Sequence, residues 1–265
     1  GSFVLDNIIP GLDVPVASIN LAEKGYVTMT LAATAEGGHS SMPPRQTAVG
    51  QLSKAVYNLQ ESPVPGGLTG VSSEFFDALG RHFTLEKRAI FANLWLFDSL
   101  LEGILAGAPS TDAMLRTTTA PTMLSGSPKA NVLSMRATAT INFRLHPRDT
   151  VDDIVEHVRT AIDDEDIEII VDREFASPAS PVSNSKSQGY LDIESSIREA
   201  FGPIAAVPGL TIAATDARHY AKVADDAYRI NPFKITSDDL TRFHGLNERL
   251  SIENVLAGIN FYAAL

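Results

Sequence analysis

The sequence contains no cysteine, no cluster of basic residues and no long hydrophobic run. Without cysteine, neither a disulfide scaffold nor a thiolate metal site can form. The 21 Lys and Arg are scattered among 32 Asp and Glu, and the formal net charge is −11. Because an acidic surface repels phosphate, we expect no nucleic-acid partner. The most apolar stretch, residues 89–96, is far shorter than the roughly 20 residues of a bilayer helix, so we expect no membrane span.

Several nucleotide and hydrolase motifs are also missing. There is no GxSxG, no P-loop and no GxGxxG, so the sequence does not support a serine hydrolase, a nucleotide-phosphate enzyme or a dinucleotide dehydrogenase. The 265 residues are 44% hydrophobic and 20% charged. That composition excludes a disordered chain and suffices for one large domain or two ordinary ones.

Hydrophobic periodicity predicts an alternation of strands and helices between residues 23 and 176. A strand over 26–33 is followed by a helix over 47–59, in which Val49, Leu52, Val56 and Leu59 share a face. A mainly helical segment over 73–105 precedes strands over 117–124 and 136–145. A helix that begins with a capping box, and a strand over 167–171, complete the series. The order favours an α+β sandwich with an antiparallel sheet.

A Ser/Pro-rich segment over 177–187 indicates a domain boundary. Beyond it the pattern predicts a helix over 189–200, strands over 210–214 and about 227–230, and a last helix after Ser251. Four apolar residues of that helix are predicted to face inward: Ile252, Val255, Leu256 and Ile259. This C-terminal third has few elements and is typical of part of a larger domain.

Two histidines have settings that suggest chemistry. His39 follows two glycines, which permit unusual backbone angles, and precedes two prolines. It could donate to a developing oxyanion or shuttle a proton, or it could simply be a turn histidine bonded to its own backbone. His244 is a candidate metal ligand, or a residue of an ordinary loop before a helix. No two of the six histidines have the spacing of a local metal motif.

Two arginines are further candidates. Arg144 lies on the polar side of a strand whose other side is apolar, and an arginine there can bind a carboxylate through two hydrogen bonds or can simply be solvated. The segment TDAR, with Thr215 and Arg218, follows an apolar strand. α/β proteins often bind ligands at such a position, although an ordinary polar loop gives the same pattern.

Four segments together resemble one family: EKGYVTMTLAATAEGGHSSMPP, KANVLSMRATATINFRLHP, TDARHY and RFHGLNERLS. They are similar to the di-zinc metallopeptidases of the aminoacylase, carboxypeptidase-S and Gly-Xaa carboxypeptidase type, and the resemblance runs from Phe3 to Leu265. In that family a lid domain, which also forms the dimer, interrupts a catalytic domain that holds two zinc ions. The resemblance implies a ferredoxin-like βαββαβ lid with a helical insertion, plus an incomplete α/β zinc-peptidase catalytic domain.

The same resemblance divides the chain into three parts. Residues 1–22 correspond to a remnant of the catalytic domain. Residues 23–177 correspond to the lid or dimerisation domain, with its helical insertion at about 73–112. Residues 178–265 correspond to the C-terminal part of the catalytic domain.

The resemblance also implies roles for particular residues. His39 matches the lid histidine that reaches into the partner subunit's site and polarises the scissile carbonyl. Asn131 matches a substrate-contacting position of the lid, and Arg144 matches the arginine that binds the substrate carboxylate. His244 matches the last zinc ligand.

Thr215 and Arg218 match a loop that closes on the same carboxylate. Relatives usually carry glycines before that threonine, where this chain has Ala213 and Ala214. The backbone contacts of this loop are therefore where we expect the chain to differ from the family pattern.

The upstream metal ligands of the family have no counterpart here. The chain has no HxD motif and no paired-glutamate segment, and one histidine cannot hold zinc. We therefore expect the C-terminal portion of an enzyme, inactive by itself. The longer parent would use two zinc ions to hydrolyse an amide bond in small peptides or N-acyl amino acids, as a homodimer. A metal-free dimerisation or binding module is the alternative, and a second polypeptide could supply the missing half. The sequence assigns no compartment.

Overall fold

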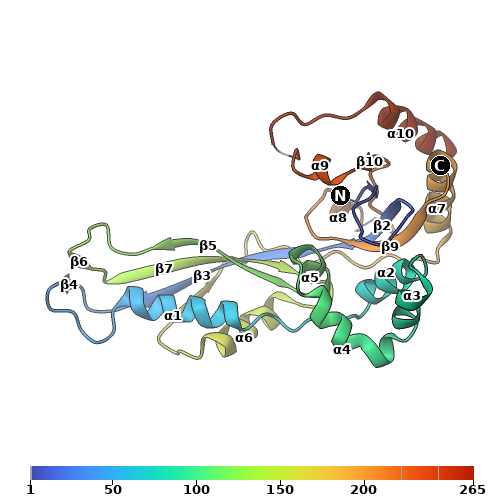
Figure 1. Ribbon diagram of the computed structural model, residues 1–265. Coiled ribbons are helices and arrows are strands. Elements are labelled where there is room, and N and C mark those ends of the chain that lie inside the picture. The colour runs from blue at the N-terminus through green and yellow to red at the C-terminus, as the bar shows by residue number, and fades with distance from the viewer. Residues whose placement is uncertain (1, 222, 244) are drawn as a thin grey trace. The chain divides into compact units, whose positions relative to one another are not determined.

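A computed structural model describes residues 2–221, 223–243 and 245–265 (Figure 1). The chain forms two compact units, each made of separate chain segments. Unit 1 consists of Gly1–Glu23, Gly67–Leu115 and Ser180–Leu265. Unit 2 consists of Lys24–Gly66 and Arg116–Ala179. The chain therefore passes from one unit to the other four times.

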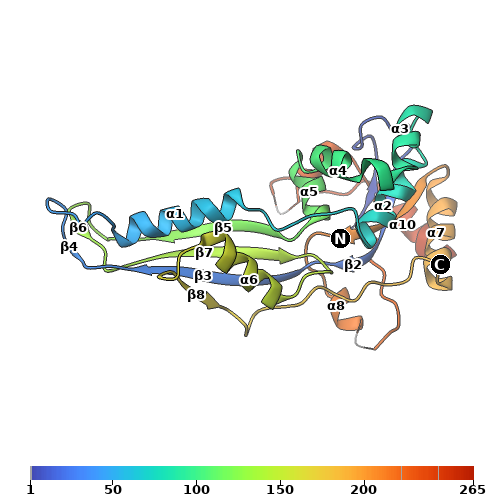
Figure 2. The ribbon, with the colours of Figure 1, turned by 90° about the horizontal axis from the view of Figure 1, so that it is seen from below.

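Unit 2 is built on a four-stranded antiparallel sheet in the order β5-β7-β3-β8. Its strands are β3 (Gly25–Thr34), β5 (Thr118–Ser125), β7 (Arg136–Leu145) and β8 (Glu168–Val171). Helix α1 (Ala48–Glu61) follows β3, and α6 (Val151–Ile162) connects β7 to β8. This is the βαββαβ order and pairing of a ferredoxin-like sheet, as predicted, and both helices cover the same face (Figures 1 and 2).

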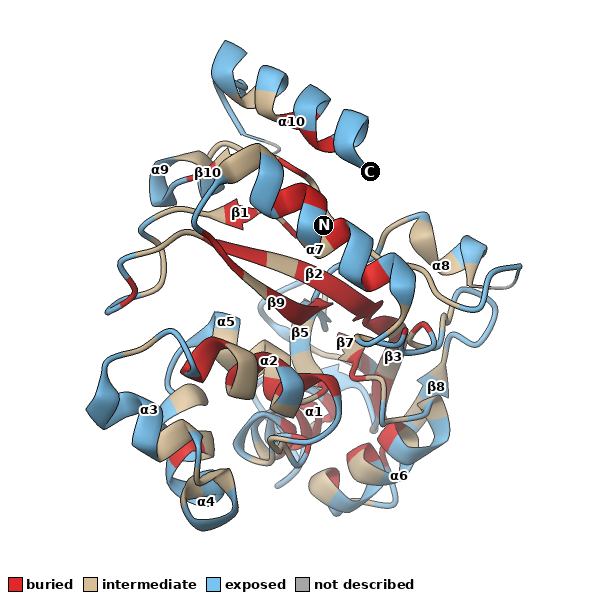
Figure 3. Cartoon of the chain, turned by 90° about the vertical axis from the view of Figure 1, so that its right-hand side faces the viewer, coloured by how far each residue is buried: buried red, intermediate tan, exposed pale blue. Residues whose placement is uncertain are grey.

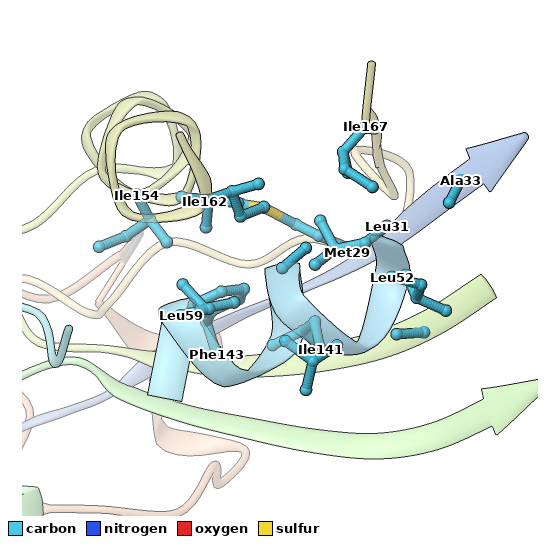
Figure 4. Packing of buried hydrophobic residues seen from close by; sticks show 14 of the residues in the cluster. Met29, Leu31, Ala33, Leu52, Leu59, Ile141, Phe143, Ile154, Ile162 and Ile167 are labelled. Carbon is cyan, nitrogen blue, oxygen red and sulfur yellow. The ribbon is translucent and has the colours of Figure 1, made fainter. Parts of the chain in front are cut away.

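The alternation of apolar residues decides which face of this sheet is buried. Every second residue of β7 from Ala137 to Leu145 is buried, and the intervening residues are exposed or half-buried. The buried residues of β3 and β7 pack against α1 and α6, as the close view in Figure 4 shows for Met29, Leu59, Phe143 and Ile154. Because side chains alternate along a strand, the other face carries the polar residues.

The two helices of unit 2 follow their sequence signals closely, with one exception. Thr150 and Asp153 form the predicted capping box of α6. Hydrogen bonds from the hydroxyl and the backbone of Thr150 lower the pKa of Asp153. On α1, Leu52, Val56 and Leu59 are buried as predicted, but Val49 is 45% exposed. The buried face of α1 instead begins at Ala48, since the helix is rotated slightly relative to the predicted face.

Unit 1 contains a mixed four-stranded sheet in the order β10-β1-β2-β9. Its strands are β1 (Val4–Leu5), β2 (Val16–Glu23), β9 (Ala205–Thr211) and β10 (Lys234–Ile235). The two longest strands, β2 and β9, pair in parallel and are almost entirely buried (Figure 3). Burial on both faces is typical of parallel strands in α/β folds, because helices cover each side.

Different helices pack on the two sides of β2 and β9. On one side lie α7 (Gln188–Phe201) and α10 (Ile252–Ala264), whose Tyr190, Ile197 and Phe261 join a core with Ile19 and Leu21. On the other side lies α2 (Val71–Gly80), whose Phe75 and Phe76 join a second core with Val16 and Val207.

The predicted helical insertion is present but packs in a different place from the expected one. It forms α2 and three further helices: α3 (Leu85–Phe91), α4 (Leu94–Leu105) and α5 (Pro109–Leu115). Residues 67–115 belong to unit 1 and not to the ferredoxin-like unit whose sequence they interrupt. The reason is the apolar face of α2, which packs on β9. No helix of the described residues is long and apolar enough to cross a membrane.

Three predictions for the C-terminal third differ from the structure. The strand predicted over 210–214 is instead β9, at Ala205–Thr211. Residues 227–230 form no strand, and only an isolated bridge joins Arg229 to Asn20. Ser251 caps α10 as predicted, but the four residues expected to face inward are exposed: Ile252, Val255, Leu256 and Ile259. Instead, α10 buries Gly258 and Phe261, because the helix lies against α7 and Phe233 through that side.

We expect the core of unit 2 to be far more sensitive to truncation than its surface. Ile141→Ala should lower the free energy of unfolding by about 2–5 kcal/mol, since Ile141 is fully buried and the change leaves a cavity. Ile170→Ala is the matched control, because Ile170 of β8 is 41% exposed, and it should cost less than about 1 kcal/mol. Denaturant titration measures both, and equal losses would contradict this core.

Candidate functional site

His39 lies in a short two-stranded ribbon that extends beyond the sheet of unit 2. The ribbon pairs β4 (Gly38–His39) with β6 (Val132–Leu133), so that His39 is opposite Val132. The amide of Ser40 donates to the carbonyl of Asn131 at 3.1 Å. The structure therefore brings together two of the predicted site residues, His39 and Asn131, and both are exposed.

Hydrogen bonds at His39 determine which ring nitrogen carries the proton in the neutral ring. The backbone N–H of Ser41 donates to His39 Nδ1 at 3.2 Å, and the hydroxyl of Ser41 lies 2.8 Å from the same atom. Because Nδ1 accepts, the proton of the neutral imidazole is on Nε2. His39 can therefore present an Nε2–H donor to a carbonyl oxygen outside the loop.

The glycines before His39 matter because they lack a side chain, and not because they adopt unusual backbone angles. Neither Gly37 nor Gly38 has a positive φ, contrary to the expectation from the sequence. A Cβ on Gly37 would lie 2.7 Å from Met135 Cγ and 3.2 Å from the carbonyl of Leu133. Glycine at position 37 thus permits the close approach of the β6 segment that forms the ribbon.

Arg144 lies on the polar face of the sheet, near the opposite end of β7. It pairs with Tyr26 and Thr118, and its guanidinium lies 5.8 Å from the centre of the Tyr26 ring. The neighbouring Asn142 donates to Thr28 Oγ1 at 3.2 Å. In the described part of the chain no acidic residue pairs with Arg144. A half-buried, unpaired guanidinium on a sheet face suits a carboxylate ligand.

The register of β3 and β7 keeps His39 and Arg144 apart. Tyr26 pairs with Arg144 and Thr34 pairs with Arg136, and His39 follows five residues after Thr34. At about 3.3 Å per residue, Tyr26 and Thr34 alone are roughly 26 Å apart. One small substrate therefore cannot touch both His39 and Arg144 of the same chain.

Thr215 lies in unit 1, where a buried carboxylate binds it. Its amide donates to Glu23 Oε2 at 3.2 Å, and its hydroxyl makes a very short hydrogen bond to the same oxygen. The amide of Ala217 donates in turn to Thr215 Oγ1 at 3.2 Å. Arg229 Nε also donates to Glu23 Oε2, at 3.1 Å. Thr215 is thus anchored to the end of β2.

Arg218, the other predicted residue of this loop, is in the short helix α8 (Ala217–Tyr220) and is half-buried. Its Nε lies 3.5 Å from His219 Nε2. No ion pair to Arg218 is present among the described residues. Among the described residues, Arg144 and Arg218 are therefore cations without an acidic partner, one in each unit.

His244, the predicted metal ligand, lies outside the described residues. Within 2–221, 223–243 and 245–265, no group of three or more His, Asp or Glu residues could hold a metal ion. Zinc in proteins takes three or four protein ligands. The described residues therefore do not fit a metal centre.

Sequence reasoning missed Glu23 and Arg229. Both are almost fully buried, with side chains 2% and 3% exposed. The available signal was the position of Glu23 at the end of the apolar segment VASINLAE, where a lone acid needs a partner. The partner could not be read from the sequence, because Arg229 is more than 200 residues away.

Comparison with known proteins decides the family. Residues 21–169 match the family model described as "Peptidase dimerisation domain". The chain belongs to the M20 peptidase family. This confirms the resemblance drawn from the four sequence segments, and the matched range includes the whole ribbon of His39 and the strand of Arg144.

Curated relatives of this M20 chain are named as carboxypeptidases or as N-fatty-acyl-amino acid synthase/hydrolases. The chain is 39% identical over 259 residues to "Probable carboxypeptidase S-like 2" of Dictyostelium discoideum, covering 98% of this chain and 50% of that protein. It is 40% identical over 267 residues to an N-fatty-acyl-amino acid synthase/hydrolase of Xenopus tropicalis, covering 100% and 52%. The chain thus spans about half the length of the curated relatives it matches.

Solved structures support the M20 fold. Human carnosine dipeptidase 1 matches with a TM-score of 0.58 at 17% identity, over 99% of this chain and 57% of that one. An M20 family metallo-carboxypeptidase from Sulfolobus solfataricus matches with a TM-score of 0.54 at 15% identity, over 94% and 63%. At these identities the solved structures show the fold of the chain.

Proposed function

We propose that the protein to which this chain belongs hydrolyses an amide bond next to a free carboxylate, in small peptides or N-acyl amino acids. The observation that carries this proposal is Arg144 on the polar face of β7, a half-buried guanidinium that has no acidic partner in the described part of the chain. A guanidinium matches a carboxylate through two parallel hydrogen bonds. The names of the relatives, a carboxypeptidase and an N-fatty-acyl-amino acid hydrolase, fit substrates that carry such a carboxylate.

In this proposal the other site residues act on either side of the scissile bond. Arg218, on the loop that Thr215 begins, is a further substrate-binding cation, in unit 1. The Nε2–H of His39 donates to the carbonyl oxygen as negative charge develops on it, which stabilises the transition state more than the ground state. Asn131, bonded to the His39 turn through its backbone, contacts the substrate beside that oxygen.

The active site is proposed to need two copies of the chain. His39 and Arg144 of one copy are too far apart to bind the same small molecule. Arg144 pairs with Tyr26, which lies eight residues along β3 from Thr34, and His39 lies beyond Thr34. Two-fold symmetry makes every interface contact reciprocal, so each copy can supply His39 to the other copy's site. The dimerisation domain of the M20 family supports this arrangement.

We propose zinc as the metal of the longer protein, with two ions and with His244 as one ligand. The described residues contain no group that fits a metal ion, so most of the ligands must come from outside this chain. By itself the chain is therefore proposed to be inactive. The same observation favours the alternative, a metal-free dimerisation or binding module, over any self-sufficient enzyme.

The test of the main proposal uses the longer protein and an N-acyl amino acid substrate. Arg144→Met should lower kcat/KM by roughly 10- to 100-fold, because it removes a charge-assisted pair worth about 1.5–3 kcal/mol. Arg136→Met is the matched control on the same face of β7, where Arg136 is exposed and pairs with Glu168. It should leave kcat/KM unchanged.

Mixing variants tests the shared site in the same assay. If His39 acts in the partner's site, Arg144→Met and His39→Ala proteins should each be weak and should regain activity after exchange of subunits. The mixed dimer has one site with both native residues. No recovery in demonstrated mixed dimers would contradict the two-copy site, and full activity of Arg144→Met would contradict the carboxylate role.

Helix α4 favours a long acyl chain as part of the substrate. Its apolar side chains Trp95, Leu96, Leu100 and Ile104 are exposed, and Trp95 is 79% exposed. We propose that this face contacts a fatty-acyl chain, which also fits the name of the Xenopus tropicalis relative. An exposed apolar helix face of this kind is typical of a binding surface.

The chain-length preference of the longer protein tests the role of α4. Trp95→Ala should reduce kcat/KM for long-chain N-acyl substrates by roughly three- to tenfold relative to short-chain ones, because it removes apolar contact area. Tyr57→Ala, at an exposed aromatic residue of α1, is the control. Phe91 is a poorer choice, since it stacks on Phe83 at 5.5 Å within the unit. An unchanged preference would rule out the acyl role.

Metal content separates the two functional candidates for the chain itself. After purification with zinc and dialysis, the 265-residue chain should retain less than about a tenth of an equivalent by elemental analysis, because a single histidine ligand binds zinc weakly. Two retained equivalents would mean that the chain holds a complete metal centre. That result would contradict the proposal that most ligands come from elsewhere.

A further inference from the structure

The strongest unassigned feature is the cluster formed by Glu23, Thr215 and Arg229, which we call the Glu23 cluster. Glu23 is the last residue of β2 and the last residue of unit 1 before the chain enters unit 2. One oxygen of its carboxylate, Oε2, accepts hydrogen bonds from the Thr215 amide, the Thr215 hydroxyl and Arg229 Nε. The cluster joins three segments that are far apart in the sequence.

The bonds of Thr215 determine what its hydroxyl can do. Glu23 accepts from a guanidinium and from a backbone N–H, as an ionised carboxylate does. Thr215 must therefore donate its only hydroxyl proton to Glu23. Its oxygen accepts from the amide of Ala217. The hydroxyl has no second proton, so in this arrangement it cannot donate to a substrate carboxylate.

Arg229 is fixed by bonds that leave little freedom. Its Nη1 donates to the carbonyl of Ala227 at 2.7 Å and to that of Leu21 at 3.4 Å. Its backbone exchanges hydrogen bonds with Asn20 of β2, at 3.0 Å in each direction. The guanidinium of Arg229 thus links Glu23 to the backbone of β2, and the same carboxylate binds Thr215 of the loop.

The cluster is also incompletely satisfied, which is unusual for buried charge. Glu23 Oε1 and Arg229 Nη2 are buried and have no hydrogen-bond partner among the described residues. Leaving such atoms unpaired is unfavourable, and a buried ion pair can often be replaced by apolar residues without loss of stability. Stability alone is therefore a poor reason for this pair, and a role in placing the loop explains it better.

We propose that Glu23 is a positioning residue: together with Arg229 it binds Thr215 and so orders the loop that carries Arg218, which the proposed function assigns to substrate binding. This inference rests on the proposed function for its substrate. Thr215 then acts through the loop and not by donating its hydroxyl proton to the substrate. The short loop from Ile212 to Asp216 joins β9 to α8, so an anchor at Thr215 fixes where α8 begins.

Hydrogen exchange of the 265-residue chain tests the anchor without any activity. In Glu23→Gln and in Thr215→Val, the amides of residues 213–219 should exchange at least about tenfold faster, because the bonds of the Thr215 amide and hydroxyl to Glu23 weaken. Thr215→Ser keeps the hydroxyl and should retain native exchange. Glu194→Gln, which removes the exposed i,i+4 pair of Glu194 with Arg198 on α7, is the matched control and should leave the loop unchanged.

The double variant separates an anchor from two independent effects. If Glu23 and Thr215 act through one contact, Glu23→Gln with Thr215→Val should accelerate exchange no more than either change alone. Multiplied effects would overturn the proposal. So would an equal acceleration throughout β2, β9 and α7, since that pattern means general destabilisation of unit 1.

Kinetics of the longer protein then test the link to the substrate. Glu23→Gln and Thr215→Val should each raise KM for an N-acyl amino acid several-fold with little change in kcat, and the double variant should behave like the singles. If Thr215 donated to the substrate, its effect would persist fully in the Glu23→Gln background. Absence of any hydrolysis would refute the proposed function and leave the exchange result standing, whereas unchanged exchange with normal hydrolysis would refute only the anchor.

Discussion

The continuous pairing of β3 with β7 is the constraint on which unit 2 and the shared site depend. Ten residues of each strand pair without a bulge, from Gly25 with Leu145 to Thr34 with Arg136. This register places the apolar residues of both strands on the helix-covered face and Arg144 on the other. It also sets the length of sheet between Arg144 and the His39 ribbon. One pairing therefore determines the core and keeps His39 away from Arg144 of the same chain.

In unit 1 the corresponding constraint is the buried parallel pair of β2 and β9. A Cβ on Gly209 would lie 2.1 Å from Ser18 Oγ and 2.4 Å from Asn20 Oδ1, so a larger residue would displace these two side chains of β2. The two strands end together, with Glu23 beside Thr211. Ligand-binding loops of α/β folds commonly leave the sheet at such carboxyl ends. The loop that carries Thr215 and Arg218 begins at this edge, within reach of the Glu23 carboxylate.

The candidate residues differ in how far the sequence could assign them. Local pattern was sufficient to select His39 and Arg144, because a turn between glycines and prolines, and a polar strand face, are both properties of neighbouring residues. It could not show that Nδ1 of His39 accepts from Ser41, or that no acidic residue within 2–221, 223–243 and 245–265 pairs with Arg144. Glu23 and Arg229 gave no recognisable motif, since the pair exists only when segments about 200 residues apart meet.

By itself, the sequence determined the four sheet strands and two helices of unit 2, the buried face of its sheet, the cap of α6 and membership in the family. Each of these depends on periodicity or on short motifs, which neighbouring residues specify. The tertiary structure decided that α2–α5 pack in unit 1, that α10 turns Phe261 and not Ile252 toward the core, and that Thr215 is bound by a buried carboxylate. These features depend on which distant segments meet, because several apolar or polar faces compete for the same partner and only the folded chain selects one.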